Sequence, residues 1–156
     1  ARRRQPMTLL GVTYTFVLLR PHKLFGAQMV WIEGQAVAIA DLEKSIIDAL
    51  DHPEYCGGIT EAAKALTTAL EEREVDLARL TDYAQRMQNG AVFKRLGYLA
   101  ERLALPVGDH PAQWQAALTG GHALLDPGRP GVGPVDTQWR VQVNVSETEI
   151  QGWQEE

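Results

Sequence analysis

A series of amphipathic segments in the middle of the chain constrains the fold more than any other feature of the sequence. Apolar side chains recur there every three or four residues, a spacing that places them on one face of an α-helix. The pattern predicts a helix capped by Asp41, three helices within residues 60–105 and a further helix that Asp109 opens. We expect Thr60 to cap the first of the three, and Asn89-Gly90 to end the second.

Apolar segments of another kind flank this helical series. Residues 8–19 are rich in β-branched and aromatic side chains and predict a strand that is largely buried. Residues 27–40 predict a hairpin with its turn at Gly34-Gln35, and residues 139–145 predict a last strand with Trp139 and the valines on one side. The order predicts an α+β, or mixed α/β, fold. We expect a small mixed or antiparallel sheet packed against a block of about five helices in one domain.

The length, the cysteine count and the apolar runs of the sequence limit the class of protein. A chain of 156 residues fits one domain with a core of its own. The single cysteine excludes an internal disulfide, and no apolar run reaches the length of a membrane helix. The first residues also lack the apolar stretch of a signal peptide. We therefore expect a soluble, cytoplasmic protein.

The charge is divided unevenly along the chain. Residues 1–30 hold five Lys or Arg and no acid, whereas residues 31–156 hold ten Lys or Arg against twenty acids. A basic arm on an acidic body indicates either a solvated linker or a contact with nucleic-acid phosphates. The sequence leaves both interpretations open.

The stretch DHPEYCGG, residues 51–58, joins two of the predicted helices and admits three interpretations. His52 and Cys56 could hold a metal, but Pro53 separates them and a structural zinc needs about four ligands. Cys56 could be a nucleophile with His52 as its base. The third interpretation, a rigid corner, fits best: Tyr55 and Cys56 point inward, and Gly57-Gly58 adopt conformations open to glycine. We expect no metal site and no catalytic residue here.

A cluster of acids and a lysine near residue 43 gives the chain an enzymatic alternative. Asp41, Glu43, Lys44 and Asp48 resemble the centre of a metal-dependent nuclease, which carries an acid, one residue and then a lysine on a strand. The intervening residue is missing between Glu43 and Lys44. The acids also suit the first turn of a helix, where the helix dipole favours negative charge.

The third helix within residues 60–105 carries a possible contact surface. With Val92 facing the core, a basic stripe falls on the opposite side, made of Lys94, Arg95, Tyr98 and Arg102. Arginine and tyrosine are frequent anchors of interfaces, so the stripe is either a solvated face or a binding surface for nucleic acid or protein. Arg20 and Lys23 are expected to extend the binding surface.

Four segments of the chain resemble a known family. They are GVTYTFVLLRPHKLFG, VAIADLEKSIIDALDHPEYCGGITEAAKAL, NGAVFKRLGYLAERLAL and QWRVQVNV, between about residues 8 and 145. They resemble the C-terminal domain of AbiE-type antitoxins, which are also described as transcriptional regulators of viral defence systems. The corner at residues 54–58 and the segment from Asn89 to Leu99 are the most specific parts of the resemblance.

The resemblance implies a role without catalysis or cofactor. In that family a winged helix-turn-helix domain comes first, binds operator DNA and represses its own operon. The domain that follows counteracts a nucleotidyltransferase-type toxin, without a stable complex, in type IV toxin–antitoxin systems that cause abortive infection against phage. The resemblance makes residues 1–7 a basic stub of the linker from that upstream domain, and residues 8–156 the antitoxin domain. A metal-dependent nuclease and a bare dimerisation module remain the alternatives.

Overall fold

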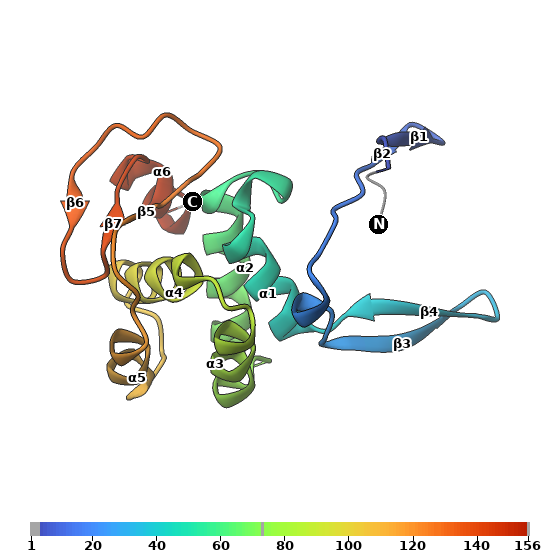
Figure 1. Ribbon diagram of the computed structural model, residues 1–156, viewed down its shortest axis with the longest axis horizontal. Helices are drawn as coiled ribbons and strands as arrows, with labels where there is room; N and C mark the ends of the chain where they lie inside the picture. Colours follow the sequence, from blue (N-terminus) through green and yellow to red (C-terminus); the bar gives the residue numbers. More distant parts are fainter. Residues whose placement is uncertain (1–3, 73, 156) are drawn as a thin grey trace.

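A computed structural model describes residues 4–72 and 74–155 and places helices between two pairs of strands and a small sheet (Figure 1). The strands are β1 (Met7–Leu9), β2 (Val12–Tyr14), β3 (Ala27–Ile32), β4 (Gln35–Ala40), β5 (Ala123–Leu124), β6 (Val135–Asp136) and β7 (Val141–Gln142). The helices are α1 (Leu42–Asp51), α2 (Ile59–Glu71), α3 (Leu77–Arg86), α4 (Gly90–Arg102), α5 (His110–Ala116) and α6 (Glu147–Gln151). Short 3-10 turns are η1 (Pro21–Lys23), η2 (Pro53–Tyr55) and η3 (Gly152–Glu155). The fold is α+β, as the sequence predicts.

Four of the described helices, α1, α3, α4 and α6, begin at capping side chains that satisfy some of their first backbone N–H groups. The Asp41 carboxylate accepts from the N–H of Lys44, the Asp76 carboxylate caps α3, and the Asn89 side chain accepts from the N–H of Ala91 in α4. Ser146 and Glu149 form the reciprocal capping box that their spacing indicates.

Two of the predicted helix boundaries are wrong. The helix α2 begins at Ile59 after Gly58, before the expected cap Thr60. Asn89-Gly90 starts α4 instead of ending α3, because the chain has already turned at Gln88, whose φ is 52°. An asparagine before glycine fits the start of a helix as well as the end of one, since its side chain caps N–H groups.

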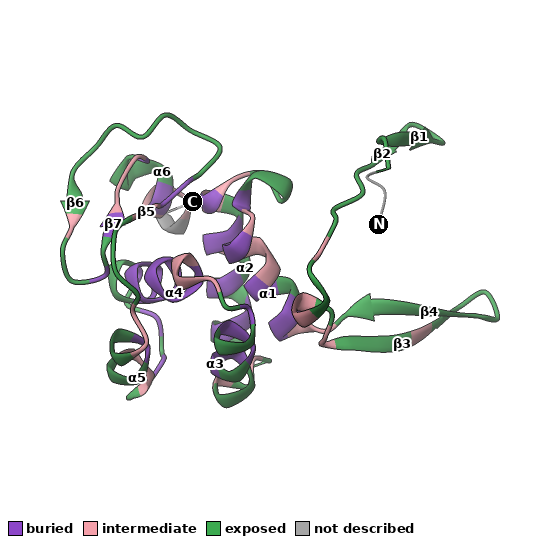
Figure 2. Cartoon of the chain, viewed as in Figure 1, coloured by how far each residue is buried: buried purple, intermediate pink, exposed green. Residues whose placement is uncertain are grey.

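The helix α4 lies at the centre of the helical block. It contacts α1 and α5, and its other sides meet β5 and β7. Every residue from Val92 to Ala100 is buried, and Figure 2 shows most of this helix in the colour of buried residues. A helix surrounded in this way has no solvated face over most of its length.

The small sheet at the C-terminal end has the order β5-β7-β6. Strand β7 runs parallel to β5 and antiparallel to β6. Trp139, Val141 and Val145 are buried as predicted, but Val143 is only half-buried, and the regular strand covers only Val141–Gln142 of the predicted residues 139–145.

The prediction of one largely buried strand over residues 8–19 is wrong. The run folds back on itself at Leu10-Gly11, where both residues have positive φ, and forms the short hairpin β1–β2. All of its strand residues are exposed. Gly11 supplies the reversal at little steric cost, and it splits the apolar run in two. Met7 pairs with Tyr14, so the paired chain begins one residue before the expected domain start at residue 8.

The predicted hairpin over residues 27–40 is confirmed. Strands β3 and β4 pair along six residues each, and the turn is Glu33-Gly34, one residue earlier than expected. Both turn residues have positive φ, as in the tight two-residue turns that match the twist of a hairpin. Figure 1 shows this hairpin, which we call the β3–β4 ribbon, projecting from the helical block.

Candidate functional site

The corner between α1 and α2 has the predicted glycine geometry but not the predicted packing. Gly57 and Gly58 both have φ of 99°, a region that side chains disfavour. Tyr55 and Cys56 are exposed, so the prediction that they point inward is wrong. Pro53, the first residue of the 3-10 turn η2, is the buried residue of this turn instead.

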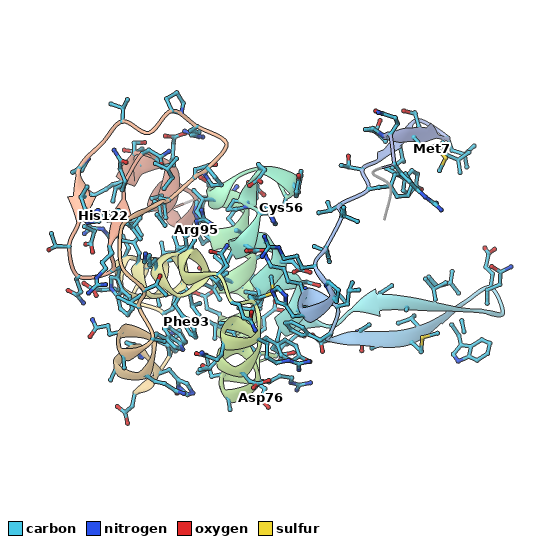
Figure 3. All side chains as sticks on the ribbon, in the orientation of Figure 1. Met7, Cys56, Asp76, Phe93, Arg95 and His122 are labelled. Carbon is cyan, nitrogen blue, oxygen red and sulfur yellow. The ribbon has the colours of Figure 1, made fainter. Side chains whose placement is uncertain are left out.

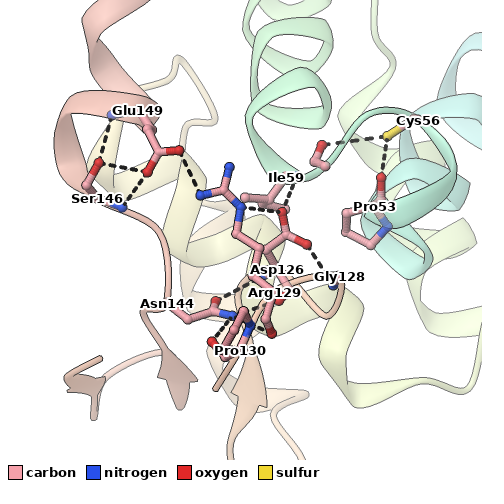
Figure 4. Close-up of polar contacts among 11 residues, drawn as sticks. Pro53, Cys56, Ile59, Asp126, Gly128, Arg129, Pro130, Asn144, Ser146 and Glu149 are labelled. Atoms are coloured by element: carbon pink, nitrogen blue, oxygen red, sulfur yellow. Dashed lines mark hydrogen bonds and ion pairs between the residues drawn. The ribbon is translucent and has the colours of Figure 1, made fainter. Parts of the chain in front are cut away.

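The Cys56 thiol at this corner is held by backbone carbonyls. It donates to the carbonyl of Pro53 at 3.3 Å, and the carbonyl of Gly58 lies 3.8 Å from its sulfur (Figure 4). Partial burial raises the pKa of the Cys56 thiol above its ordinary value, which is the opposite of what a nucleophile requires. The His52 ring contacts Glu54, with 2.9 Å between Nδ1 and Oε1. Within residues 4–72 and 74–153, no group of three His, Cys, Asp or Glu is arranged to hold a metal.

Asp126 closes the corner from a distant part of the chain. Its carboxylate accepts from the N–H of Ile59, the first residue of α2, at 3.2 Å and from the N–H of Gly128 at 2.9 Å. Asn144 brackets the backbone of Asp126, accepting from its N–H and donating to its carbonyl (Figure 4). The sequence offered only a weak signal for this residue, an aspartate before Pro-Gly.

The basic stripe predicted on α4 is not a surface. Lys94, Arg95 and Tyr98 are all at least 96% buried, so the prediction that they face solvent is wrong. The reason is that β5, β7 and the segment between α5 and β5 cover the side of α4 opposite Val92. Arg95 is labelled within the helical block in Figure 3.

The two buried cations of α4 hold backbone carbonyls of other elements. The Lys94 ammonium donates to the carbonyls of Gly120 and Gly121 at 3.1 and 2.8 Å. The Arg95 guanidinium donates to Leu124 of β5 at 3.0 Å and to Leu50 of α1 at 2.7 Å. Burial lowers the pKa of both side chains, Lys94 and Arg95. Lys94 and Arg95 therefore hold α4 to α1, to β5 and to the segment before β5.

Tyr98 and Arg102 do come together at one end of α4. The Arg102 guanidinium lies 5.8 Å from the centre of the Tyr98 ring and pairs with Glu147 of α6 at 2.8 Å. Both line a cavity of about 520 Å³ whose other wall contains Val135 and Val143. The acid of Glu147 offsets the charge of Arg102, which leaves this cavity without a net basic character.

The remaining two predicted binding residues lie far from that cavity in the chain. Lys23 forms an ion pair with the buried Asp51, with 2.6 Å between Nζ and Oδ2, and Arg20 is exposed. Of the basic arm, Arg2 and Arg3 lie outside the described residues, and Arg4 lies 5.8 Å from the ring centre of Phe16. The six predicted residues thus do not form one continuous surface.

The acid and lysine cluster lies on a helix rather than on a strand. Asp41 accepts from the Tyr83 hydroxyl at 2.8 Å in addition to capping α1, and Glu43 accepts from the N–H of Asp76 at 2.8 Å. Lys44 is buried and pairs with Asp48. The hydrogen bonds of Asp41 and Glu43 position α1 against α3. The cluster has neither the strand nor the residue spacing of the nuclease pattern.

The exposed apolar surface gathers on the two hairpins, which sequence reasoning did not single out. The β3–β4 ribbon exposes 61% of Met29, 73% of Trp31 and 53% of Ile32. The β1–β2 hairpin adds Leu10, which is 95% exposed, and Met7, labelled in Figure 3. Figure 2 shows both hairpins almost wholly in the colour of exposed residues. The signal in the sequence was the lack of any charged residue from Ala27 to Ile32 and from Gln35 to Ala40.

Comparison of the chain with protein-family models, curated proteins and solved structures finds no match. Among the described helices, none has the length and apolar character needed to cross a bilayer.

Proposed function

We propose that this chain is a non-enzymatic antitoxin domain of the AbiE type, which counteracts a nucleotidyltransferase-type toxin in the cytoplasm. The assignment rests on the resemblance of residues 8–145 to that family. The same resemblance implies the type IV mode of action. The domain would oppose the toxin's effect without a stable complex, while an upstream winged helix-turn-helix domain would bind operator DNA and repress the operon.

The structural observation that supports this proposal is the exposed apolar β3–β4 ribbon. Large apolar side chains exposed in groups are typical of surfaces that contact other macromolecules. Trp31 and Met29 stand out from a helical block whose buried charged side chains are engaged in hydrogen bonds within the fold. The ribbon is therefore suited to a transient contact with another macromolecule, which agrees with a role that needs no stable complex with the toxin.

A growth assay tests the proposal. We expect that co-expression of this chain with the toxin encoded beside it restores growth relative to an empty vector. The double variant Met29→Ser/Trp31→Ser should lose the rescue, since it removes the apolar surface of the ribbon. Leu10→Ser is the matched control, because it removes an exposed apolar side chain from the other hairpin.

Circular dichroism of the purified chains shows whether the variants keep the helical block. Arrested growth in the presence of the folded, unmodified chain would contradict the proposal. Equal rescue by the variant Met29→Ser/Trp31→Ser would show that the antitoxin role does not depend on the ribbon.

A further inference from the structure

The register of the β3–β4 ribbon divides its side chains into two unlike faces. Residues that pair directly across antiparallel strands point to the same side, and successive residues alternate. One face, the Trp31 face, consists of Ala27, Met29, Trp31, Ala36, Ala38 and Ala40. The other, the Val30 face, consists of Gln28, Val30, Ile32, Gln35, Val37 and Ile39. The Trp31 face therefore has its two large side chains on β3 and only alanines on β4.

This division makes the Trp31 face complementary to itself. Two copies of a ribbon stacked face to face are related by a two-fold axis that runs either along the strands or across them. With the axis along the strands, Trp31 lies over Ala36 of the second copy, because Ala36 is its cross-strand pair. With the axis across the strands at the level of Met29, the middle of the three residues that β3 gives to this face, Trp31 lies over Ala27 of the second copy. Either way the largest side chain meets one of the smallest, as close packing of two sheets requires.

The charge distribution also favours a second copy at this place. The whole chain carries a net charge of −5, so two copies repel each other over most of their surfaces. The strands of the ribbon carry no charged residue, and six residues extend roughly 20 Å at the rise of a β-strand. With the axis across the strands the two acidic bodies lie at opposite ends of the stacked ribbons, and this length exceeds the Debye length of about 8 Å at physiological salt. With the axis along the strands the bodies lie at the same end, so the charge favours the axis across the strands. The ribbon thus offers a contact at which the repulsion between the acidic bodies is screened.

The ribbon is also incomplete as an isolated two-stranded element. A hairpin exposed on both faces is at best marginally stable in water, and covering one face with further strands stabilises it. A single ribbon face is small beside the roughly 800 Å² per partner of a standard interface. The area therefore points to a reversible dimer of modest affinity.

We propose that the Trp31 face of the β3–β4 ribbon is a self-association surface, on which a second copy of this chain stacks its own Trp31 face. This dimer goes beyond the proposed antitoxin role and does not depend on it, because it is a property of the purified chain without toxin or DNA.

Sedimentation velocity of the chain tests the proposal over protein concentrations from about 1 to 300 µM, the range expected of a small interface. We expect the sedimentation coefficient to rise from monomer to dimer. Trp31→Glu should raise the dissociation constant at least about tenfold, since Trp31 is the anchor of the face. Leu10→Glu is the matched control, with the same charge placed on the other hairpin, and it should leave the dissociation constant unchanged.

Tryptophan emission gives a second measurement. Of the four tryptophans, Trp114 and Trp139 are buried in the monomer and Trp153 is half-buried, whereas Trp31 is 73% exposed, so association should shift the emission of Trp31 to shorter wavelength. A chain that stays monomeric over the whole range overturns the proposal. A dimer that persists in Trp31→Glu but is lost in Val30→Asp overturns it too, because the second copy would then use the Val30 face. Circular dichroism confirms that the helical block is intact in each variant.

Discussion

Gly97 in the middle of α4 provides the sharpest test of how this fold is packed. A glycine inside a helix is ordinarily a weakness, and replacing it with alanine stabilises a helix by about 1 kcal/mol. Here the Trp139 ring lies directly against the Gly97 backbone. A Cβ atom at residue 97 would lie 2.0 Å from one ring carbon of Trp139 and 2.1 Å from another. We therefore expect Gly97→Ala to destabilise the protein, against the helix propensity.

The magnitude follows from the distance that the ring would have to move. Carbon atoms in contact lie about 3.5–4.0 Å apart, so the ring or the helix must shift by roughly 1.5 Å. Overpacking of this kind costs about 1–3 kcal/mol, and complete loss of a buried tryptophan costs about 3–5 kcal/mol. Trp139 is only 1% exposed, and its indole N–H donates to Glu101 at 2.8 Å, so the shift also strains that bond. The two ranges meet at about 3 kcal/mol, and subtracting the gain of about 1 kcal/mol in helix propensity leaves a net loss of about 2 kcal/mol.

Urea unfolding followed by circular dichroism measures the loss, which corresponds to a fall in Tm of about 4–8 °C for a chain of this size. Gly152→Ala is the control, because its Cβ would meet only Thr148 at an ordinary 3.7 Å. In the Trp139→Ala background the same change at Gly97 should become neutral or stabilising. Stabilisation by Gly97→Ala in the otherwise unchanged protein would refute the packing argument.

Two further predictions concern buried polar contacts. Arg95→Met should lower the free energy of unfolding by about 3 kcal/mol, because the substitution leaves buried backbone carbonyls of α1 and β5 without their donor. Urea unfolding measures this loss, and a loss below about 1 kcal/mol would contradict the role of Arg95 in joining these elements. Tyr83 should ionise above the ordinary tyrosine range, because the hydrogen bond from its hydroxyl to Asp41 raises the pKa of Tyr83. The raised pKa makes this contribution to stability complete below about pH 10 and lost as the pH rises through the folded value. Absorbance titration near 295 nm should register a lower pKa for Tyr83 in Asp41→Asn, and an unchanged titration would show that the bond is not the cause.

The helical block was predictable because its signals are local. Asp41 and Ser146 cap the helices that follow them, and the apolar spacing of each helix identifies one buried face. These features depend on residues within one or two turns, which a reading of the sequence captures. The α+β class follows from the order of such segments.

The role of α4 was not predictable in the same way. Lys94 and Arg95 have the spacing of a solvated face, and long cationic side chains are seldom fully buried. Their partners are carbonyls 26 to 45 residues away in the chain, and backbone carbonyls leave no trace in the sequence. The hairpin β1–β2 was missed for a related reason, since an apolar run does not distinguish one buried strand from two short exposed strands around Gly11.

The long-range bond of Asp126 bears on the order in which the chain folds during synthesis. The N–H that it caps at Ile59 lies 67 residues earlier in the sequence. At about 5–20 residues per second, a ribosome needs roughly 3–13 s to make the intervening segment. Throughout that interval the first turn of α2 has only water to satisfy this donor, whereas Arg95, the donor to the last turn of α1, is made about halfway through it. The corner between the two helices therefore closes late, together with the C-terminal sheet.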